Sequence, residues 1–80
     1  MSELASESST LTVREIFCHV LEADDIGDDA DFFALGGDSL LATRVLSAIA
    51  RHHGVELTFD DFVLAPTPGG LTEKIASVSA

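Results

Sequence analysis

Near its middle, the 80-residue chain reads DFFALGGDSLLA over residues 31–42. Gly36 and Gly37 have no side chains, so the backbone can turn sharply there and a large partner can approach closely. Ser39 stands where a helix should begin, and serine is one of the residues most favoured at a helix N-cap. A helix N-terminus also favours a negative group, by about 0.3–1 kcal/mol. The stretch therefore predicts a tight turn followed by a helix that Ser39 caps.

Apolar residues with helical spacing lie on both sides of this stretch. Thr12 and Glu15 are spaced as a capping box, and the apolar residues from Val13 to Leu21 form one stripe. No segment alternates convincingly between apolar and polar residues, which argues against a sheet. The pattern predicts an all-α fold of three main helices and one short one. The first helix begins near Thr12, and the second runs from about Ser39 to His53, before Gly54. The short helix runs from Thr58 to Leu64, and the last one has Thr67 as its N-cap and ends near Val78.

The segment between the first two helices is long and acidic. Residues 22–38 hold seven of the fourteen acids and no basic residue, yet they also contain Ile26, Phe32, Phe33 and Leu35. A long loop with its own apolar residues can pack back on a core, and such loops are often functional. We therefore expect a long loop between helices one and two that leads directly to Ser39.

One apolar residue lies on the polar side of the second helix. Leu40, Arg44, Ser47 and Arg51 share a face there, opposite the stripe that is expected to be buried. Leu40 is therefore expected to be exposed beside the Ser39 hydroxyl. Together with the flexible glycines and the helix N-terminus, it suits a serine that receives a phosphate-linked group from another protein.

The composition excludes several classes of protein. A net charge of −10 argues against binding to nucleic acid or to an anionic membrane. A single cysteine, Cys18, permits no internal disulfide, and no apolar run is long enough to span a membrane. The N-terminus has no signal-peptide pattern, so we expect a cytoplasmic protein. We expect a mobile polar tail over residues 1–9 and a single domain over residues 10–78; the Met1 start favours a free-standing protein.

Catalytic and metal sites find little support. The acidic loop fits neither possible EF-hand frame, so no metal site is predicted. Leu41 occupies the position at which a nucleophile elbow around Ser39 would need glycine. His52 and His53 lie about 20 Å away along the same helix, at ~1.5 Å per residue, although spacing alone does not exclude His19. No catalytic residue is predicted.

Residues 31–42 resemble the attachment motif of peptidyl carrier proteins, the thiolation domains of nonribosomal peptide synthetases. The resemblance covers about residues 11–77 and includes the hydrophobic positions around Ile26 and the Pro66-Thr67 pair. It implies an acyl carrier protein-like four-helix bundle. The double Phe and the Gly-Gly pair favour the peptidyl branch over the acyl carriers of polyketide and fatty-acid systems. Pro68-Gly69-Gly70 departs from the family pattern and puts the start of the last helix in doubt.

The resemblance implies a function as well as a fold. The serine that matches Ser39 is modified with 4′-phosphopantetheine from coenzyme A by a phosphopantetheinyl transferase, and the arm then holds an aminoacyl or peptidyl group as a thioester. Adenylation enzymes load this arm, and condensation, tailoring or thioesterase enzymes receive the cargo. The implied partner contacts are Asp38, Leu40 and Arg44 near Ser39, and Phe62 and Val63 on the short helix; Gly36 and Gly37 belong to the motif backbone.

Three further expectations accompany this resemblance. The carrier is not itself an enzyme, acts as a monomer, and uses its acidic loop to approach basic surfaces of its partners. The alternatives are an acyl carrier protein of a polyketide or fatty-acid pathway and, from a different class, a non-carrier interaction module in which Ser39 is only a helix cap. A small serine hydrolase is the remote third alternative.

Overall fold

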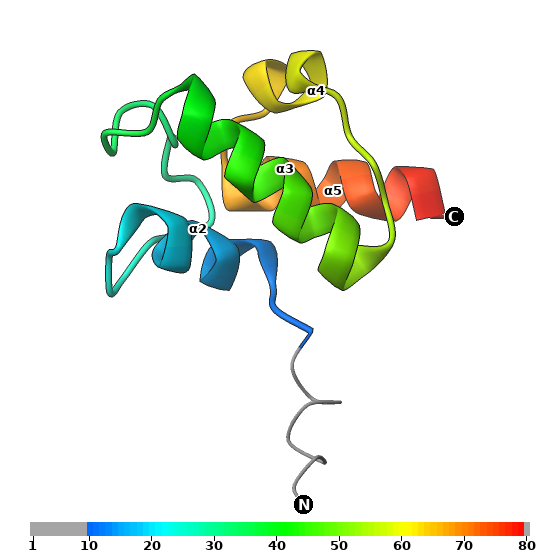
Figure 1. The fold of residues 1–80 in the computed structure, drawn as a ribbon, viewed down its shortest axis with the longest axis horizontal. Helices are drawn as coiled ribbons and strands as arrows, with labels where there is room; N and C mark the ends of the chain where they lie inside the picture. The colour runs from blue at the N-terminus through cyan, green and yellow to red at the C-terminus, as the bar shows by residue number, and fades with distance from the viewer. Residues whose placement is uncertain (1–9, 80) are drawn as a thin grey trace, which may run out of the picture.

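The computed structural model describes residues 10–79 and contains four helices (Figure 1). They are α2 (Val13–Leu21), α3 (Ser39–His53), α4 (Phe59–Leu64) and α5 (Pro68–Ser79). Helix α2 packs against α3 and α5, and the short α4 connects α3 to α5 and contacts both. Residues 10–79 contain no strand, and the loop from α2 to α3 is long. The predicted all-α bundle is confirmed; the tail expected over residues 1–9 lies outside the described residues.

Local hydrogen bonds set the limits of α2. The Thr12 hydroxyl accepts from the Glu15 N–H at 3.1 Å, and the Glu15 carboxylate accepts from the Thr12 N–H at 2.9 Å. These reciprocal bonds form the predicted capping box, and losing an N-cap costs about 0.5–2 kcal/mol. At the other end Glu22 adopts the left-handed conformation, with φ of 55°.

The short helix α4 has a capping box of its own. The Thr58 hydroxyl accepts from the Asp61 N–H at 3.1 Å, and the Asp61 carboxylate accepts from the Thr58 N–H at 3.0 Å. The helix therefore begins at Phe59, with Thr58 as its cap rather than its first residue. Hydrogen bonding of the Asp61 carboxyl with the backbone and the side chain of Thr58 lowers the pKa of Asp61 below its ordinary value, and Lys74, whose Nζ lies 3.8 Å from Asp61 Oδ1, adds to the effect.

This pKa shift predicts a pH-dependent stability. A carboxyl whose pKa is lowered by folding stabilises the folded state above its unfolded pKa, and the contribution is lost as pH falls through the folded value. The wild type should therefore melt at a higher temperature than Asp61→Asn at neutral pH, and the difference should vanish well below pH 3.8. Thermal melts across this range measure it. Asp60→Asn, in the same turn, should show a smaller difference; equal melting of the wild type and Asp61→Asn at neutral pH would contradict the expectation.

The start of α5 is packed tightly against the long loop. The helix begins at Pro68 as predicted, and the Thr67 hydroxyl accepts from the Gly70 N–H at 3.0 Å. The Gly69 N–H donates to the Asp28 carbonyl at 2.8 Å, and a Cβ on Gly69 would lie only 3.0 Å from that oxygen. Glycine at position 69 therefore allows the loop and the helix to approach this closely.

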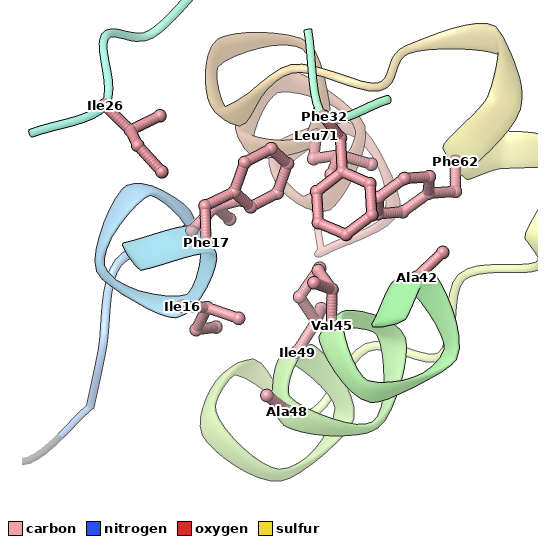
Figure 2. Close-up of a cluster of buried hydrophobic side chains, with 11 residues drawn as sticks. Ile16, Phe17, Ile26, Phe32, Ala42, Val45, Ala48, Ile49, Phe62 and Leu71 are labelled. Carbon is pink, nitrogen blue, oxygen red and sulfur yellow. The ribbon is translucent and has the colours of Figure 1, made fainter. Parts of the chain in front are cut away.

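Three phenylalanines form the centre of the core (Figure 2). Phe17, Phe32 and Phe62 are all 0% exposed, and their ring centroids lie 5.0 to 6.1 Å apart. Phe32 comes from the long loop, so this loop does pack back on the core. The remaining core residues are aliphatic and come from every helix except α4: Val13, Ile16, Ile26, Ala42, Val45, Ala48, Ile49 and Leu71, with Ile26 from the loop. Within residues 10–79 no helix is long and apolar enough to cross a membrane.

Candidate functional site

Ser39 is the first residue of α3 and is exposed. The residue before it, Asp38, has extended backbone angles, and its Oδ1 accepts from the Leu41 N–H at 2.9 Å. The Asp38 carbonyl accepts from the Ala42 N–H at 2.8 Å. The interpretation of Ser39 as the N-cap is therefore wrong, because Asp38 fills that role one residue earlier. As a result, the Ser39 hydroxyl has no capping function and is available at the surface.

The turn before Ser39 is fixed to the core. The Asp31 carboxylate accepts from the N–H groups of Phe33 and Ala34 at 2.8 and 3.2 Å, and the Phe32 N–H donates to the Pro66 carbonyl at 2.8 Å. The Gly37 N–H then donates back to the Phe32 carbonyl at 3.0 Å. These bonds hold residues 31–37 in one compact turn, so the buried Phe32 ring fixes the position from which α3 begins.

Each glycine of the motif has a separate structural reason. Gly36 has a φ of 103°, which side chains rarely tolerate, so the sharp turn expected there is present. Gly37 has no such backbone requirement; a Cβ at this position would overlap the ring of Phe32. The lack of a side chain at Gly37 therefore serves the core.

Exposed apolar side chains gather near Ser39 and on α4. We call this set the apolar rim: Phe33, Leu35, Leu40, Phe59, Val63 and Leu64, each 38–77% exposed. The Phe33 ring lies 5.8 Å from the ring of Phe62, so the loop before Ser39 and α4 are neighbours. Exposed apolar side chains on neighbouring segments are typical of an interaction site.

The residues predicted to contact partners differ in their exposure to solvent. Leu40 is 65% exposed and Val63 48% exposed, while Asp38 and Arg44 are also at the surface. Phe62 is 0% exposed, so the prediction that it contacts partners is wrong. Phe62 is the buried residue of α4, and its ring lies 5.0 Å from the ring of Phe32 and 6.1 Å from that of Phe17.

Several members of the apolar rim were not expected at this surface from their sequence pattern. Phe33 and Leu35 were expected to pack inward with the loop, and Leu64 was counted only as the end of the short helix. The adjacent pair Phe32-Phe33 carried a usable signal, since neighbouring residues in a turn rarely point the same way. That signal does not say which ring goes inward.

Histidines lie far from Ser39 along α3. His52 Nδ1 accepts from the Leu11 N–H at 3.4 Å, and His53 Nε2 lies 2.7 Å from the Leu11 carbonyl oxygen. Both rings therefore hold the chain before α2 against the C-terminal end of α3, about 20 Å from Ser39 at ~1.5 Å per residue. Within the described residues no group of three or more His, Cys, Asp and Glu side chains could hold a metal ion.

Comparison with known proteins explains this arrangement. A family model described as "Phosphopantetheine attachment site" matches residues 12–75. The chain belongs to this family. Its members carry phosphopantetheine, derived from coenzyme A, as a covalently attached group. The family is one of carriers rather than catalysts, which agrees with the exposed position of the serine.

Relatives of this phosphopantetheine-attachment domain are nonribosomal peptide synthetases. The chain is 43% identical over 61 residues to a dimodular nonribosomal peptide synthase of Bacillus subtilis. The aligned region covers 76% of this chain and 3% of the relative. It is 39% identical over 85 residues to nonribosomal peptide synthetase 6 of Cochliobolus heterostrophus, covering 99% of this chain and 5% of the relative. The chain thus spans only a small part of the relatives it matches.

Solved structures of peptidyl carrier proteins share the fold. The solution structure of an active-site mutant peptidyl carrier protein superposes with a TM-score of 0.83 at 30% identity, covering 91% of this chain and 81% of that one. A second structure holds the phosphopantetheine transferase Sfp in complex with coenzyme A and a peptidyl carrier protein. This match has a TM-score of 0.79 at 32% identity and covers 81% of this chain and 84% of that one. The chain is therefore a carrier domain of the peptidyl type.

The residues at the start of α3 fit a phosphopantetheine group. A phosphodiester requires an exposed hydroxyl, and Ser39 supplies one. The first backbone N–H groups of a helix have no acceptor within the helix. Asp38 accepts from the N–H groups of Leu41 and Ala42, and not from those of Ser39 and Leu40. These donors and the positive end of the helix dipole suit a negatively charged phosphate.

Proposed function

We propose that Ser39 is the phosphopantetheine attachment site and that residues 10–78 form a carrier domain for nonribosomal peptide synthesis. The observation that carries this is the free, exposed Ser39 hydroxyl at the start of α3, with Asp38 as the cap. The arm ends in a thiol that can hold an aminoacyl or peptidyl group as a thioester. A cytoplasmic, monomeric protein fits this role.

Attachment requires a phosphopantetheinyl transferase. The Ser39 Oγ forms a bond to the phosphorus that bears the pantetheine, the P–O bond of the pyrophosphate in coenzyme A breaks, and adenosine 3′,5′-bisphosphate leaves. The hydroxyl proton passes to a base of the transferase. The exposed position of Ser39 allows the enzyme to reach this oxygen, and Asp38 lies beside it as a further contact for the transferase or its metal.

The experiment for the attachment site uses the whole chain. The protein is incubated with coenzyme A and a broad-specificity transferase, and its intact mass is measured. A gain of one phosphopantetheine, located by fragmentation on the peptide that contains Ser39, supports the proposal. An unchanged mass, or a gain on another residue, overturns it.

Partner enzymes are proposed to dock on the apolar rim. Adenylation enzymes would load the arm, and condensation, tailoring or thioesterase enzymes would receive its cargo, each contacting the surface around Ser39. Leu40 and Val63 supply apolar contact, Arg44 supplies charge, and the acidic loop faces basic surfaces of the partners. The named relatives are peptide synthetases, so a peptide cargo is favoured over the acyl cargo of polyketide or fatty-acid systems.

Leu40 provides a direct test of this docking surface. Because Leu40 is 65% exposed, Leu40→Ala should change the free energy of unfolding by no more than about 0.5 kcal/mol. Loss of a central apolar contact with a partner costs about 1–2 kcal/mol, so loading by an adenylation enzyme should slow roughly 5- to 30-fold. Thermal melts and loading rates measure the two effects.

The matched control is Val78→Ala. Val78 is 63% exposed and lies near the C-terminal end of α5, away from the start of α3 (Figure 1). This variant should leave loading unchanged. If both variants load at the wild-type rate, or if Leu40→Ala melts several degrees lower, Leu40 is not a docking residue.

A further inference from the structure

Asp31 begins the turn that leads to Ser39, and it binds three backbone groups of that turn. Its Oδ1 accepts from the Phe33 N–H at 2.8 Å and from the Ala34 N–H at 3.2 Å. Its carbonyl oxygen accepts from the Leu35 N–H at 3.1 Å. A short carboxylate that accepts from backbone N–H groups two and three residues ahead fixes a turn as an N-cap fixes a helix. Asp31 therefore holds the backbone of the residues that follow it.

The residues held by Asp31 include the part of the apolar rim that belongs to the loop. Phe33 is 38% exposed and Leu35 is 45% exposed, whereas Phe32 is buried. Phe32 has support of its own, because its ring lies in the core and its N–H donates to the Pro66 carbonyl (Figure 2). Exposed side chains are less restricted by the core, so the direction of Phe33 and Leu35 depends on the backbone of the turn.

Phe33 also connects this turn to α4. Its ring centroid lies 5.5 Å from that of Phe32 and 5.8 Å from that of Phe62, and the rings are close to perpendicular in both pairs. A ring in this place joins the loop's part of the apolar rim to the part on α4. A displaced turn would therefore separate the two parts of the rim and would also move the loop's part relative to Ser39.

The negative charge of Asp31 is a competing explanation for any role in docking. The ion pairs among residues 10–79 do not include Asp31; they join Arg14 to Asp28 and Lys74 to Asp61. The Asp31 carboxylate is instead bonded to two backbone N–H groups. An amide oxygen can accept the same bonds without a charge, since aspartate and asparagine both form turns of this kind. Substitution can therefore separate the hydrogen bonds from the charge.

We propose that Asp31 is a positioning residue for the docking of partner enzymes, and that it acts through its hydrogen bonds rather than through its charge. Its carboxylate holds the turn over residues 31–37 so that Phe33 and Leu35 reach the surface before Ser39. The proposal rests on Ser39 as the attachment site and on the apolar rim as the docking surface. Because Asp31 acts through the rim, its loss weakens binding of the enzyme and leaves the transfer step itself unchanged.

Steady-state transfer from coenzyme A by a broad-specificity transferase tests this proposal. The initial rate is measured against the concentration of the carrier. Asp31→Ala should raise KM for the carrier by about 5-fold or more, with kcat within about 2-fold of the wild type. Asp31→Asn keeps the hydrogen bonds and should keep KM within about 2-fold of the wild type. Asp31→Glu keeps the charge, but its longer side chain is a poor cap, so it should resemble Asp31→Ala.

The matched control is Glu73→Ala, which removes an exposed carboxylate from α5 and should leave KM unchanged. If Asp31→Asn raises KM as much as Asp31→Ala while Asp31→Glu behaves as the wild type, the charge is what acts, and the proposal is overturned. Wild-type KM values for all three variants overturn it as well. The assays use a temperature at which thermal melts show every chain folded. A variant of Asp31 that is unfolded at every temperature would show that Asp31 supports the core rather than the rim.

Hydrogen exchange measured by NMR reports on the turn directly. The amides of Phe33 and Ala34 should exchange faster in Asp31→Ala and Asp31→Glu than in the wild type and Asp31→Asn. The Ala42 amide, which donates to the Asp38 carbonyl at 2.8 Å, should exchange equally in all four chains. Unchanged exchange of Phe33 and Ala34 in Asp31→Ala would contradict the positioning role.

A second kinetic series shows whether Asp31 acts through the two exposed residues. A chain that carries Phe33→Ala and Leu35→Ala should itself have a raised KM. Adding Asp31→Ala to this chain should change KM by no more than about 2-fold, because residues that act through one another are not additive. A further rise as large as in the wild-type background overturns the proposal. A wild-type chain that gains no phosphopantetheine, or gains it at a residue other than Ser39, would instead contradict the attachment site.

Discussion

Ser39→Ala is expected to abolish the gain of mass that coenzyme A and a transferase produce. Only the Ser39 oxygen lies exposed at the start of α3 with no capping function, so its removal leaves the transferase no acceptor there. The expected effect is complete loss, measured by intact mass. Ser47→Ala removes an exposed hydroxyl from the same helix and should be modified as the wild type is.

The same variant distinguishes a carrier from a module in which Ser39 is only a cap. Because Asp38 caps α3, Ser39→Ala should leave the melting temperature nearly unchanged, whereas Asp38→Ala should cost about 0.5–2 kcal/mol. A Ser39→Ala variant that still gains one phosphopantetheine would contradict the attachment site. A large loss of stability in Ser39→Ala would show instead that the hydroxyl supports the helix.

Phe32→Ala is expected to have the largest effect on stability. Its ring is 0% exposed and lies 5.0 Å from both Phe17 and Phe62 (Figure 2). Truncating a buried phenylalanine to alanine costs about 3–5 kcal/mol, a large part of the stability of a domain this small. Denaturant unfolding should show this loss. Modification of Ser39 should also slow, because Phe32 anchors the turn that positions the start of α3.

The matched control for this loss is the neighbouring ring. Phe33 is 38% exposed, so Phe33→Ala should lose less than half as much stability as Phe32→Ala. Equal losses from the two variants would show that the loop does not hold one ring in the core and the other at the surface.

The difference between Phe32 and Phe33 shows where sequence reasoning reaches its limit. Both residues are apolar and adjacent, and the loop pattern predicts only that some of its apolar residues pack inward. The choice depends on the space between Phe17 and Phe62, which come from helices far apart in the chain. The same space requires glycine at position 37, because a Cβ there would overlap the Phe32 ring.

The cap of α3 shows the same limit at shorter range. Asp38 and Ser39 are both good N-cap residues, because the side chain of each could accept a hydrogen bond from the backbone N–H three residues ahead. The structure places the boundary at Asp38 because the turn over residues 31–37, fixed by Phe32 and Pro66, ends there. The position of the boundary decides the chemistry, since it leaves the serine hydroxyl free.

The amino-acid sequence alone determined the four helices, most of their ends and the motif around Ser39. Capping boxes and helical stripes depend on residues three or four positions apart, so they can be read without the rest of the fold. Tertiary structure decided which apolar residues form the apolar rim and why Phe62 is buried. These features depend on space shared by segments distant in the chain, and no local pattern of residues specifies how that space is divided.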